Sequence, residues 1–242
     1  SPKGWTGPKV VDGLPVENSF RAHQVPIMID SPEHLKELST WLRSYHPERL
    51  FDKGGHFRPD LKELAPKGNQ RIGSNPHANG GLLLKDLKMP DFRKYAFPVN
   101  KHGSTDAQDM TELGKFIRDV IKKNDDTKNF RIFGPDETLS NRLNAVFEAT
   151  NRQWDNATLP TDEFLTSDGR VIDSMLSEHC CEGWLEGYLL TGRHGFFCSY
   201  EAFIRIVDSM VAQHAKWLKV SNQLPWRQKI SSLNLLLAST VW

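Results

Sequence analysis

The chain has 242 residues, enough for one large domain or two modest ones, and its 38% hydrophobic and 25% charged residues are typical of a globular protein. A net charge of +1 argues against a nucleic-acid-binding or membrane-binding surface built on bulk charge. No apolar run approaches the ~20 residues of a membrane span, and three cysteines are too few for a disulfide framework. These totals favour a protein of a reducing compartment such as the cytoplasm.

The first part of the chain predicts one helix among turns. Residues 1–32 are rich in glycine, proline and β-branched residues, which predicts short extended pieces. A helix is expected over SPEHLKELSTWLRSY, with Ser31 as its N-cap and Pro32 at the first helical position. Residues 46–105 are dense in turns and show little periodicity, so we interpret them as a linker that packs along a surface and joins two domains.

From Asp106 onward, helices alternate with short apolar strands. Helical spacing of apolar residues predicts four helices, at 106–124, 140–150, 177–190 and 199–219. Strands are expected in the three segments NFRIFGP, GRVIDSML and KISSLNLLLAST. This alternation predicts an α/β fold, a parallel sheet flanked by helices on both faces. Because the last strand stands at the end of the chain, we expect the sheet to be incomplete.

The stretch LSEHCCEGWLEGYLLTGRHG combines cysteines, a histidine and several acids. His179, Cys180 and Cys181 are consecutive, and consecutive helical residues point about 100° apart, so they cannot converge on one metal ion. A catalytic thiol needs a partner base, and the sequence specifies none. Both cysteines are therefore interpreted as small apolar fillers, and no metal site is predicted.

Three glutamates of this stretch recur every four residues. Glu178, Glu182 and Glu186 therefore share one helical face, which predicts a solvated acidic stripe. However, apolar residues cover much of the rest of the helix, and a helix that is apolar all round is buried. A buried carboxyl has a raised pKa and can hold a proton at neutral pH, so a catalytic glutamate is the alternative. The residues alone leave both interpretations open.

Long blocks of the sequence resemble the phosphoketolases. These blocks are SPKGWTGP, SFRAHQVP, GSNPHANGG, GPDETLSNRL, SEHCCEGWLEGYLLTGRHG, SYEAFIRIVDSMVAQHAKWLK and PWRQKISSLNLLLASTVW. The resemblance implies a thiamine-diphosphate enzyme, an aldehyde-lyase that cleaves xylulose 5-phosphate, and often fructose 6-phosphate, with inorganic phosphate. The products would be acetyl phosphate and an aldose phosphate. It also implies a cytoplasmic homodimer or higher oligomer with no nucleic-acid or membrane partner.

The resemblance implies that this chain is a central fragment of a longer one. Residues 1–45 would end the domain that holds the cofactor's diphosphate, 46–105 would be the interdomain linker, and 106–242 would begin the domain that holds its pyrimidine ring. The superfamily's GDG…N stretch for the diphosphate and its magnesium ion does not occur in the sequence. We therefore expect the metal ligands outside this fragment, and we expect the fragment alone to be inactive.

Three cofactor contacts follow from the resemblance, besides the catalytic glutamate. Glu178 is similar to the superfamily glutamate that hydrogen-bonds the cofactor's pyrimidine N1′ and so favours the tautomer that deprotonates the thiazolium C2. Lys3 and His23 resemble a pair near the diphosphate and the reacting carbons, with His23 also in a catalytic role. Tyr200 resembles the ring beside the pyrimidine. The residues alone favour a frayed terminal lysine, a loop histidine and a core tyrosine.

Two further residues resemble those that hold the sugar phosphate in the family. Ser140 is one, and its position also predicts a helix N-cap. Arg227 is the other, and by itself it predicts only a solvated arginine. His77 and His194 are interpreted as structural, because histidines in turns usually bind the backbone.

Two alternatives to a phosphoketolase fragment stay open. One is a non-catalytic dimerisation or interaction module of the enzyme. The other is a transketolase-like enzyme, which we disfavour because the block around Glu178 matches phosphoketolases beyond that shared residue.

Overall fold

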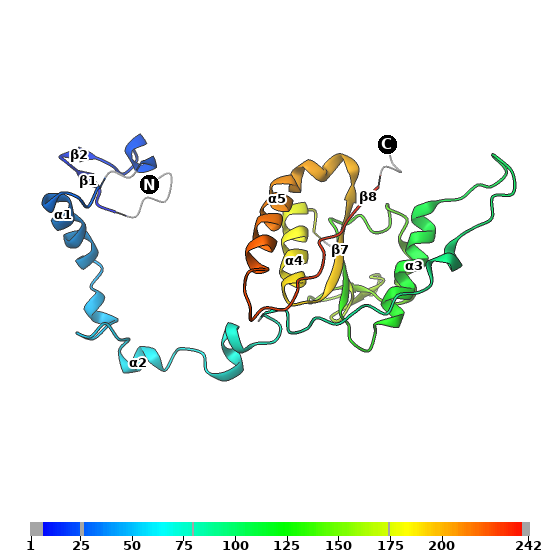
Figure 1. Ribbon diagram of the computed structural model, residues 1–242, viewed down its shortest axis with the longest axis horizontal. Coiled ribbons are helices and arrows are strands. Elements are labelled where there is room, and N and C mark those ends of the chain that lie inside the picture. The colour runs from blue at the N-terminus through cyan, green and yellow to red at the C-terminus, as the bar shows by residue number, and fades with distance from the viewer. Residues whose placement is uncertain (1–6, 25–26, 79, 174, 239–242) are drawn as a thin grey trace. The chain divides into compact units, whose positions relative to one another are not determined.

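The chain divides into two compact units between Lys67 and Gly68. The computed structural model describes residues 7–24, 27–78, 80–173 and 175–238 (Figure 1). Lys3, for which the resemblance implies a cofactor contact, lies outside the described residues. The two units are described separately below.

The first unit is a small hairpin followed by helical turns. Its elements are β1 (Val10–Val11), β2 (Leu14–Pro15), η1 (Phe20–His23), α1 (Pro32–Arg43), η2 (Pro47–Arg49) and α2 (Pro59–Lys62). The predicted start of α1 is confirmed, because the Ser31 side chain accepts a hydrogen bond from the His34 amide and Pro32 is the first helical residue. A small cluster of Val11, Val16, Ala22 and Ile27 forms its apolar centre.

The second unit is built on a six-stranded sheet in the order β5-β4-β6-β3-β7-β8, in which every neighbouring pair is parallel. The strands are β3 (Phe130–Phe133), β4 (Arg152–Gln153), β5 (Leu165–Thr166), β6 (Val171–Ile172), β7 (His194–Tyr200) and β8 (Leu235–Ala238). The helices are η3 (Gly68–Gln70), η4 (Ile72–Ser74), η5 (Phe92–Tyr95), α3 (Asp109–Lys123), η6 (Asn144–Glu148), α4 (Glu178–Leu190), η7 (Glu201–Phe203) and α5 (Ile204–Ser221).

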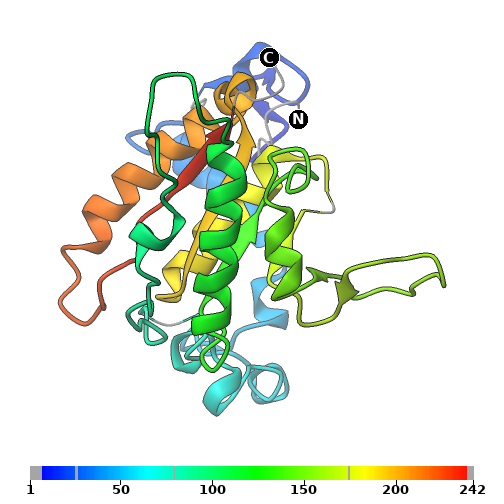
Figure 2. The same ribbon diagram turned by 90° about the vertical axis from the view of Figure 1, so that its right-hand side faces the viewer.

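Helices lie on both faces of this sheet, as predicted. α3 packs on one face, where Val120 and Ile121 join Ile132 of β3 in a buried cluster. α4 and α5 lie on the other face, where Leu185 joins Phe133 of the same strand in a second cluster (Figure 1). Successive side chains of β3 therefore enter opposite clusters, as the two-residue period of a strand requires. The connection between β4 and β5 extends away from the sheet (Figure 2).

Two predictions for this unit are wrong. The helix expected over 140–150 is only the short 3₁₀ turn η6, because Arg142 adopts a left-handed φ of 61°, which an α-helix excludes. The sequence analysis predicts no strand at β7, the longest strand of the sheet, and places the end of β7 in the helix expected over 199–219. The other three helices of this unit are confirmed as α3, α4 and α5.

Within the second unit, residues 80–95 are held to later parts of the chain by side-chain and backbone hydrogen bonds. The Asn124 side chain bonds both the amide and the carbonyl of Lys88, at 3.0 and 3.1 Å. The His194 ring lies 2.7 Å from the Lys85 carbonyl, which confirms the structural interpretation of that histidine. Throughout the described part of the chain, no helix is both long enough and apolar enough to cross a membrane.

Candidate functional site

The sheet has a topological switch point at β3. From β3 the chain builds β4, β5 and β6 on one side of that strand, and then β7 and β8 on the other. In open parallel sheets, ligands bind in the crevice outside the carboxyl ends of the strands at such a point. Residues 134–141 after β3, Asp173 after β6, and Tyr200 at the end of β7 stand at these carboxyl ends, and we refer to this region as the crevice.

Three carboxyl groups gather at the crevice. Asp173 is fully buried, and its Oδ1 accepts a hydrogen bond from Arg152 Nε at 2.7 Å. Glu137 is 7% exposed, and its Oε2 accepts a hydrogen bond from the Tyr200 amide at 3.0 Å. Burial raises the pKa of Glu137, and the negative charge of the nearby Glu178 raises it further. The crevice is therefore acidic and partly shielded from water.

Glu178 is positioned by the start of α4. It is the first residue of the helix, and it is half-buried. Ser177 caps the helix, because its side chain accepts a hydrogen bond from the Cys180 amide at 3.4 Å. The helix N-terminus favours a negative charge at Glu178, whereas the neighbouring Glu137 opposes it.

Several buried polar atoms around the crevice have no partner in the structure. The Thr138 hydroxyl, the oxygen and the nitrogen of the Asn141 amide, and the second carboxyl oxygen of Asp173 are buried and make no hydrogen bond with any described residue. An unsatisfied buried polar group costs roughly 1–3 kcal/mol. These three oxygens therefore suit a bound group that donates hydrogen bonds.

Of the three cysteines, Cys181 and Cys198 are buried and Cys180 is exposed. Burial raises the pKa of the Cys181 and Cys198 thiols to about 12, so neither is a thiolate near neutral pH. The apolar-filler interpretation is confirmed for Cys181 and wrong for Cys180, which is exposed.

The glutamates farther along α4 are not a solvated stripe. Glu182 is fully buried and Glu186 is half-buried, so the interpretation of this face as a solvated stripe is wrong, whereas a catalytic role for a glutamate stays a prediction. The buried His214 of α5 lies with its Nδ1 3.6 Å from a Glu186 oxygen. Burial raises the pKa of Glu182 to about 7, and the nearby Glu186 adds to the shift.

Three of the residues expected at a site lie around the crevice. Glu178 and Tyr200 both approach Glu137, as described above. Ser140 is exposed in the loop after β3, and its hydroxyl donates to the Glu137 carbonyl at 3.3 Å. The predicted helix N-cap at Ser140 is wrong, because η6 begins at Asn144 without a side-chain cap.

The other expected residues lie elsewhere. Arg227 Nη2 donates to the carbonyl of Leu190 at 2.8 Å. Leu190 ends the 13-residue helix α4, about 18 Å along its axis from Glu178. His23 is the exposed last residue of η1 in the first unit. The structure of the second unit therefore does not bring Arg227 together with Ser140.

Sequence reasoning missed the buried acids of the crevice. Glu137 and Asp173 both follow apolar strands within a few residues, and that position is the signal that would have found them. Thr138 and Asn141 carry no such signal, because a polar residue in a turn is ordinary.

The fold and the crevice define an open α/β protein whose candidate ligand site lies at the carboxyl ends of parallel strands. Comparison with known families gives a more particular result. Residues 111–242 match the family described as D-xylulose 5-phosphate/D-fructose 6-phosphate phosphoketolase, and residues 1–83 match the N-terminal domain of the same family. The chain belongs to the phosphoketolase family.

Individual relatives agree with this result. A protein named probable phosphoketolase from Clostridium acetobutylicum is 66% identical over 245 residues, covering 100% of this chain and 31% of the relative. Proteins of the same name from Rhodopirellula baltica and Gloeobacter violaceus are 61% and 62% identical, each over 244 residues with the same coverage. The chain therefore spans about a third of the length of these relatives.

Proposed function

We propose that the chain is the central part of a phosphoketolase that cleaves xylulose 5-phosphate, and fructose 6-phosphate, with inorganic phosphate. The products would be acetyl phosphate and an aldose phosphate. The description of the matching family and the names of the relatives support this proposal. Because the chain spans 31% of those relatives, the activity belongs to the whole protein, and the 242 residues alone would be inactive. We place the protein in the cytoplasm as a homodimer or higher oligomer.

The domain assignment is part of this proposal. Residues 1–45 would end the domain that holds the diphosphate of the cofactor, 46–105 would link two domains, and 106–242 would begin the domain that holds its pyrimidine ring. The parallel sheet with a switch-point crevice supports the last of these assignments.

Thiamine diphosphate is the proposed cofactor, and the crevice fits its pyrimidine end. An aminopyrimidine carries N–H donors, and the crevice holds the three unpartnered oxygens of Thr138, Asn141 and Asp173. Glu178 can share a proton with a ring nitrogen, and the Tyr200 ring can lie against the heterocycle. When bound, the cofactor would supply a nucleophilic carbon for the ketose carbonyl and an electron sink for the negative charge that develops there.

For the diphosphate and its magnesium ion we propose residues beyond this chain, together with Lys3 and His23. Within the described ranges, no group of three or more histidine, cysteine or acidic side chains is placed to hold a metal ion. Magnesium requires near-octahedral oxygen coordination, which those side chains do not assemble.

The single observation that carries the mechanism is the position of Glu178, the half-buried first residue of α4, near the buried acid Glu137. In the proposed role, the Glu178 carboxyl shares a proton with a ring nitrogen of the cofactor, and the start of α4 fixes its position. Burial raises the pKa of the neighbouring Glu137, which makes it the second candidate for proton chemistry.

For the sugar phosphate we propose the exposed hydroxyl of Ser140, in the loop that follows β3. A hydroxyl donor at the rim of the crevice suits a phosphate oxygen. Arg227 remains a proposed phosphate ligand on the resemblance alone, because in this structure its guanidinium binds the Leu190 carbonyl at the other end of α4.

The products test the proposed function. Whole protein, purified with the cofactor and magnesium, is mixed with xylulose 5-phosphate and inorganic phosphate. Acetyl phosphate should form in proportion to the sugar consumed. A transketolase would instead need an aldose acceptor and would form no acetyl phosphate, so that pattern would overturn the proposal.

A further inference from the structure

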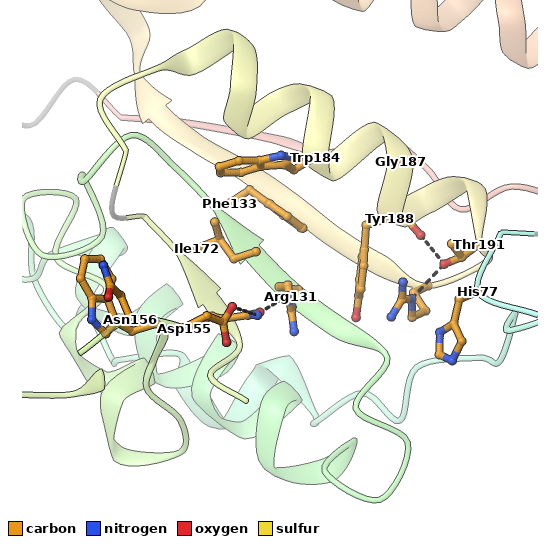
Figure 3. Close-up of a pocket in the computed structure, with 13 residues that line it drawn as sticks. His77, Arg131, Phe133, Asp155, Asn156, Ile172, Trp184, Gly187, Tyr188 and Thr191 are labelled. Atoms are coloured by element: carbon orange, nitrogen blue, oxygen red, sulfur yellow. Dashed lines mark hydrogen bonds between the residues drawn. The ribbon is translucent and has the colours of Figure 1, made fainter. Parts of the chain in front are cut away.

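A concave surface lies on the sheet face that carries α4. It is a groove of about 770 Å³ beside α4, over β3, β4 and β6 (Figure 3). Phe133 and Ile172 contribute apolar side chains from the strands, and Trp184 and Tyr188 contribute aromatic side chains from α4. Polar side chains, among them Asp155, make up much of the remaining wall. The volume lies within the range of about 300–1,000 Å³ that is typical of ligand pockets.

Three guanidinium groups surround Tyr188 at one end of the groove. Arg193 lies over its ring at 4.0 Å from the centroid, and Arg131 lies 5.6 Å from it. Arg170 approaches from the edge, where its Nη2 donates to the Tyr188 hydroxyl at 2.6 Å. Three cations therefore lie around a single aromatic ring.

Their hydrogen-bond partners are neutral. Arg131 donates to the Gln153 amide oxygen, and Arg193 donates to the Thr191 hydroxyl at 2.9 Å. Arg170 donates to the carbonyls of Lys128 and Phe130. Among the residues that the structure describes, no acidic side chain lies within 4 Å of any of these three guanidinium groups, although Arg152 nearby forms such a pair with Asp173.

The positive charges of this cluster are only partly compensated. Burial, and then the charges of Arg170 and Arg193, lower the pKa of Arg131 to about 10, while the negative charge of Asp155, which also lines the groove, acts in the opposite direction. The Arg131 Nε is buried and has no hydrogen-bond partner among the described residues. A cation near the C-terminal end of α4 is favoured by the helix dipole, but the dipole does not account for three cations and a buried free donor.

We propose that the groove binds a small organic anion, with its phosphate or carboxylate group between Arg131 and Arg193 and its apolar body against Trp184 and Phe133. Guanidinium groups present paired donors that match the oxygens of a phosphate or a carboxylate. An anion would balance the charge of the arginines and would satisfy the buried Nε. Trp184 is 43% exposed along the groove, which leaves a flat apolar surface for a planar ligand.

The arginine end of the proposed site is separate from Glu178, whereas its apolar end includes Phe133 and Ile172, the last residues of β3 and β6. Tyr188 and Thr191 lie at the C-terminal end of α4, whereas Glu178 is its first residue. Arg131 pairs with Gly195 near the start of β7, which is the amino end of the strands. Binding at the groove can therefore be measured on the 242-residue chain, independently of the proposed catalytic function.

Titration of phenyl phosphate into the chain tests the proposal, with tryptophan fluorescence and calorimetry as readouts. Binding should saturate, and Arg193→Gln and Arg131→Gln should each weaken it about tenfold, since a hydrogen bond to a charged group is lost. Arg205→Gln, an exposed arginine of α5, is the matched control and should leave the dissociation constant unchanged. Trp184→Ala should weaken phenyl phosphate and leave inorganic phosphate unaffected.

Benzoate and benzyl alcohol complete the design. Tighter binding of phenyl phosphate identifies a phosphate site, and tighter binding of benzoate identifies a carboxylate site. Equal binding of the neutral benzyl alcohol, or no binding of either anion at millimolar concentration, overturns the proposal. If Arg131→Gln does not fold, Arg193→Gln and the substitution of the partly exposed Trp184 still decide the result.

Discussion

Glu182 is a fully buried carboxyl between two helices. Its own helix places Glu186 one turn away, and the facing helix α5 contributes the buried His214. Burial and the charge of Glu186 raise the pKa of Glu182 to about 7, while burial lowers the pKa of His214. Neither carboxyl oxygen of Glu182 has a hydrogen-bond partner among the described residues. Ionisation of Glu182 is therefore costly for the folded state.

The sign of the pH dependence follows from the raised pKa of Glu182. The folded state binds more protons than the unfolded state, whose glutamate titrates near 4.5, so stability falls as the pH rises from there to about 7. Glu182→Met, a neutral side chain of similar length, should flatten this fall. At about pH 8 the free energy of unfolding of the variant should exceed that of the original chain by on the order of 3 kcal/mol. Burial lowers the pKa of His214 from 6.5, so this residue has the opposite effect: it reduces the stability of the folded state as the pH falls below 6.5.

Urea unfolding of both chains at about pH 5 and about pH 8 checks this prediction. The exposed Glu163 provides the matched control, and Glu163→Gln should keep the original pH dependence. A Glu182→Met chain that loses stability with rising pH as steeply as the original would show that Glu182 is not the titrating group.

Ser140 is the serine proposed to bind the sugar phosphate. Its hydroxyl is exposed, and its 3.3 Å hydrogen bond to Glu137 lies in a turn, so Ser140→Ala should leave the fold intact. In the whole protein, the Michaelis constant for the sugar phosphate should rise roughly tenfold, with little change in the chemical rate, because a ground-state phosphate contact is lost. Ser232→Ala, at another exposed serine, is the control. An equal effect on a sugar without the phosphate would refute this role.

At the scale of elements, the turn between α4 and β7 depends on Gly192. Its φ is 93°, and a Cβ there would lie 2.4 Å from the Leu84 nitrogen and 2.6 Å from the Gly81 carbonyl. Both the backbone conformation and the close approach of residues 81–84 therefore require glycine. The turn holds that segment against the sheet unit through the hydrogen bond from the Leu83 amide to the Thr191 carbonyl.

Gly192→Ala should consequently destabilise the chain by at least about 2 kcal/mol, from backbone strain and overpacking combined. Gly187→Ala is the matched control, because its Cβ would meet nothing within 4 Å inside α4. That control should be neutral or stabilise by roughly 0.5–1 kcal/mol, since alanine favours a helix. Denaturant midpoints of the two variants provide the comparison, and equal midpoints would contradict this account of the turn.

Local signals predicted some elements and missed others for identifiable reasons. α1 was predictable from its Ser31 cap and apolar spacing, and α3 from apolar spacing alone, since no side chain caps it. β7 was missed because its sequence HGFFCSY holds only three consecutive apolar residues, and its burial on both faces removes the alternation that marks a half-exposed strand. The segment 140–150 shows helical apolar spacing, but Val146 enters the core from a 3₁₀ turn instead.

At the scale of the whole molecule, the site is assembled from distant parts of the chain. The crevice joins Glu137, Asp173 and Glu178, and Arg152 reaches Asp173 from a different strand. No spacing rule connects these positions, so their proximity was not predictable from local patterns. The resemblance supplied Glu178 and Ser140, and the buried partners became visible only with the sheet order.

The arginine groove is also a property of the folded unit. Arg131 belongs to β3 and Arg193 to the turn before β7, so the sequence shows two unrelated cations. The parallel pairing of β3 with β7 brings both against Tyr188 of α4. Such a cluster is predictable only when strand order and register are known.

The central claim is that Glu178 carries the proton chemistry of a phosphoketolase. Its most direct test is the rate of acetyl phosphate formation from xylulose 5-phosphate and inorganic phosphate by the whole protein, with Glu178→Gln and the control Glu163→Gln measured beside the original. We predict that Glu178→Gln loses at least about 100-fold in rate with an unchanged melting temperature, whereas the control keeps the original rate. A near-normal rate for a correctly folded Glu178→Gln protein would contradict the account.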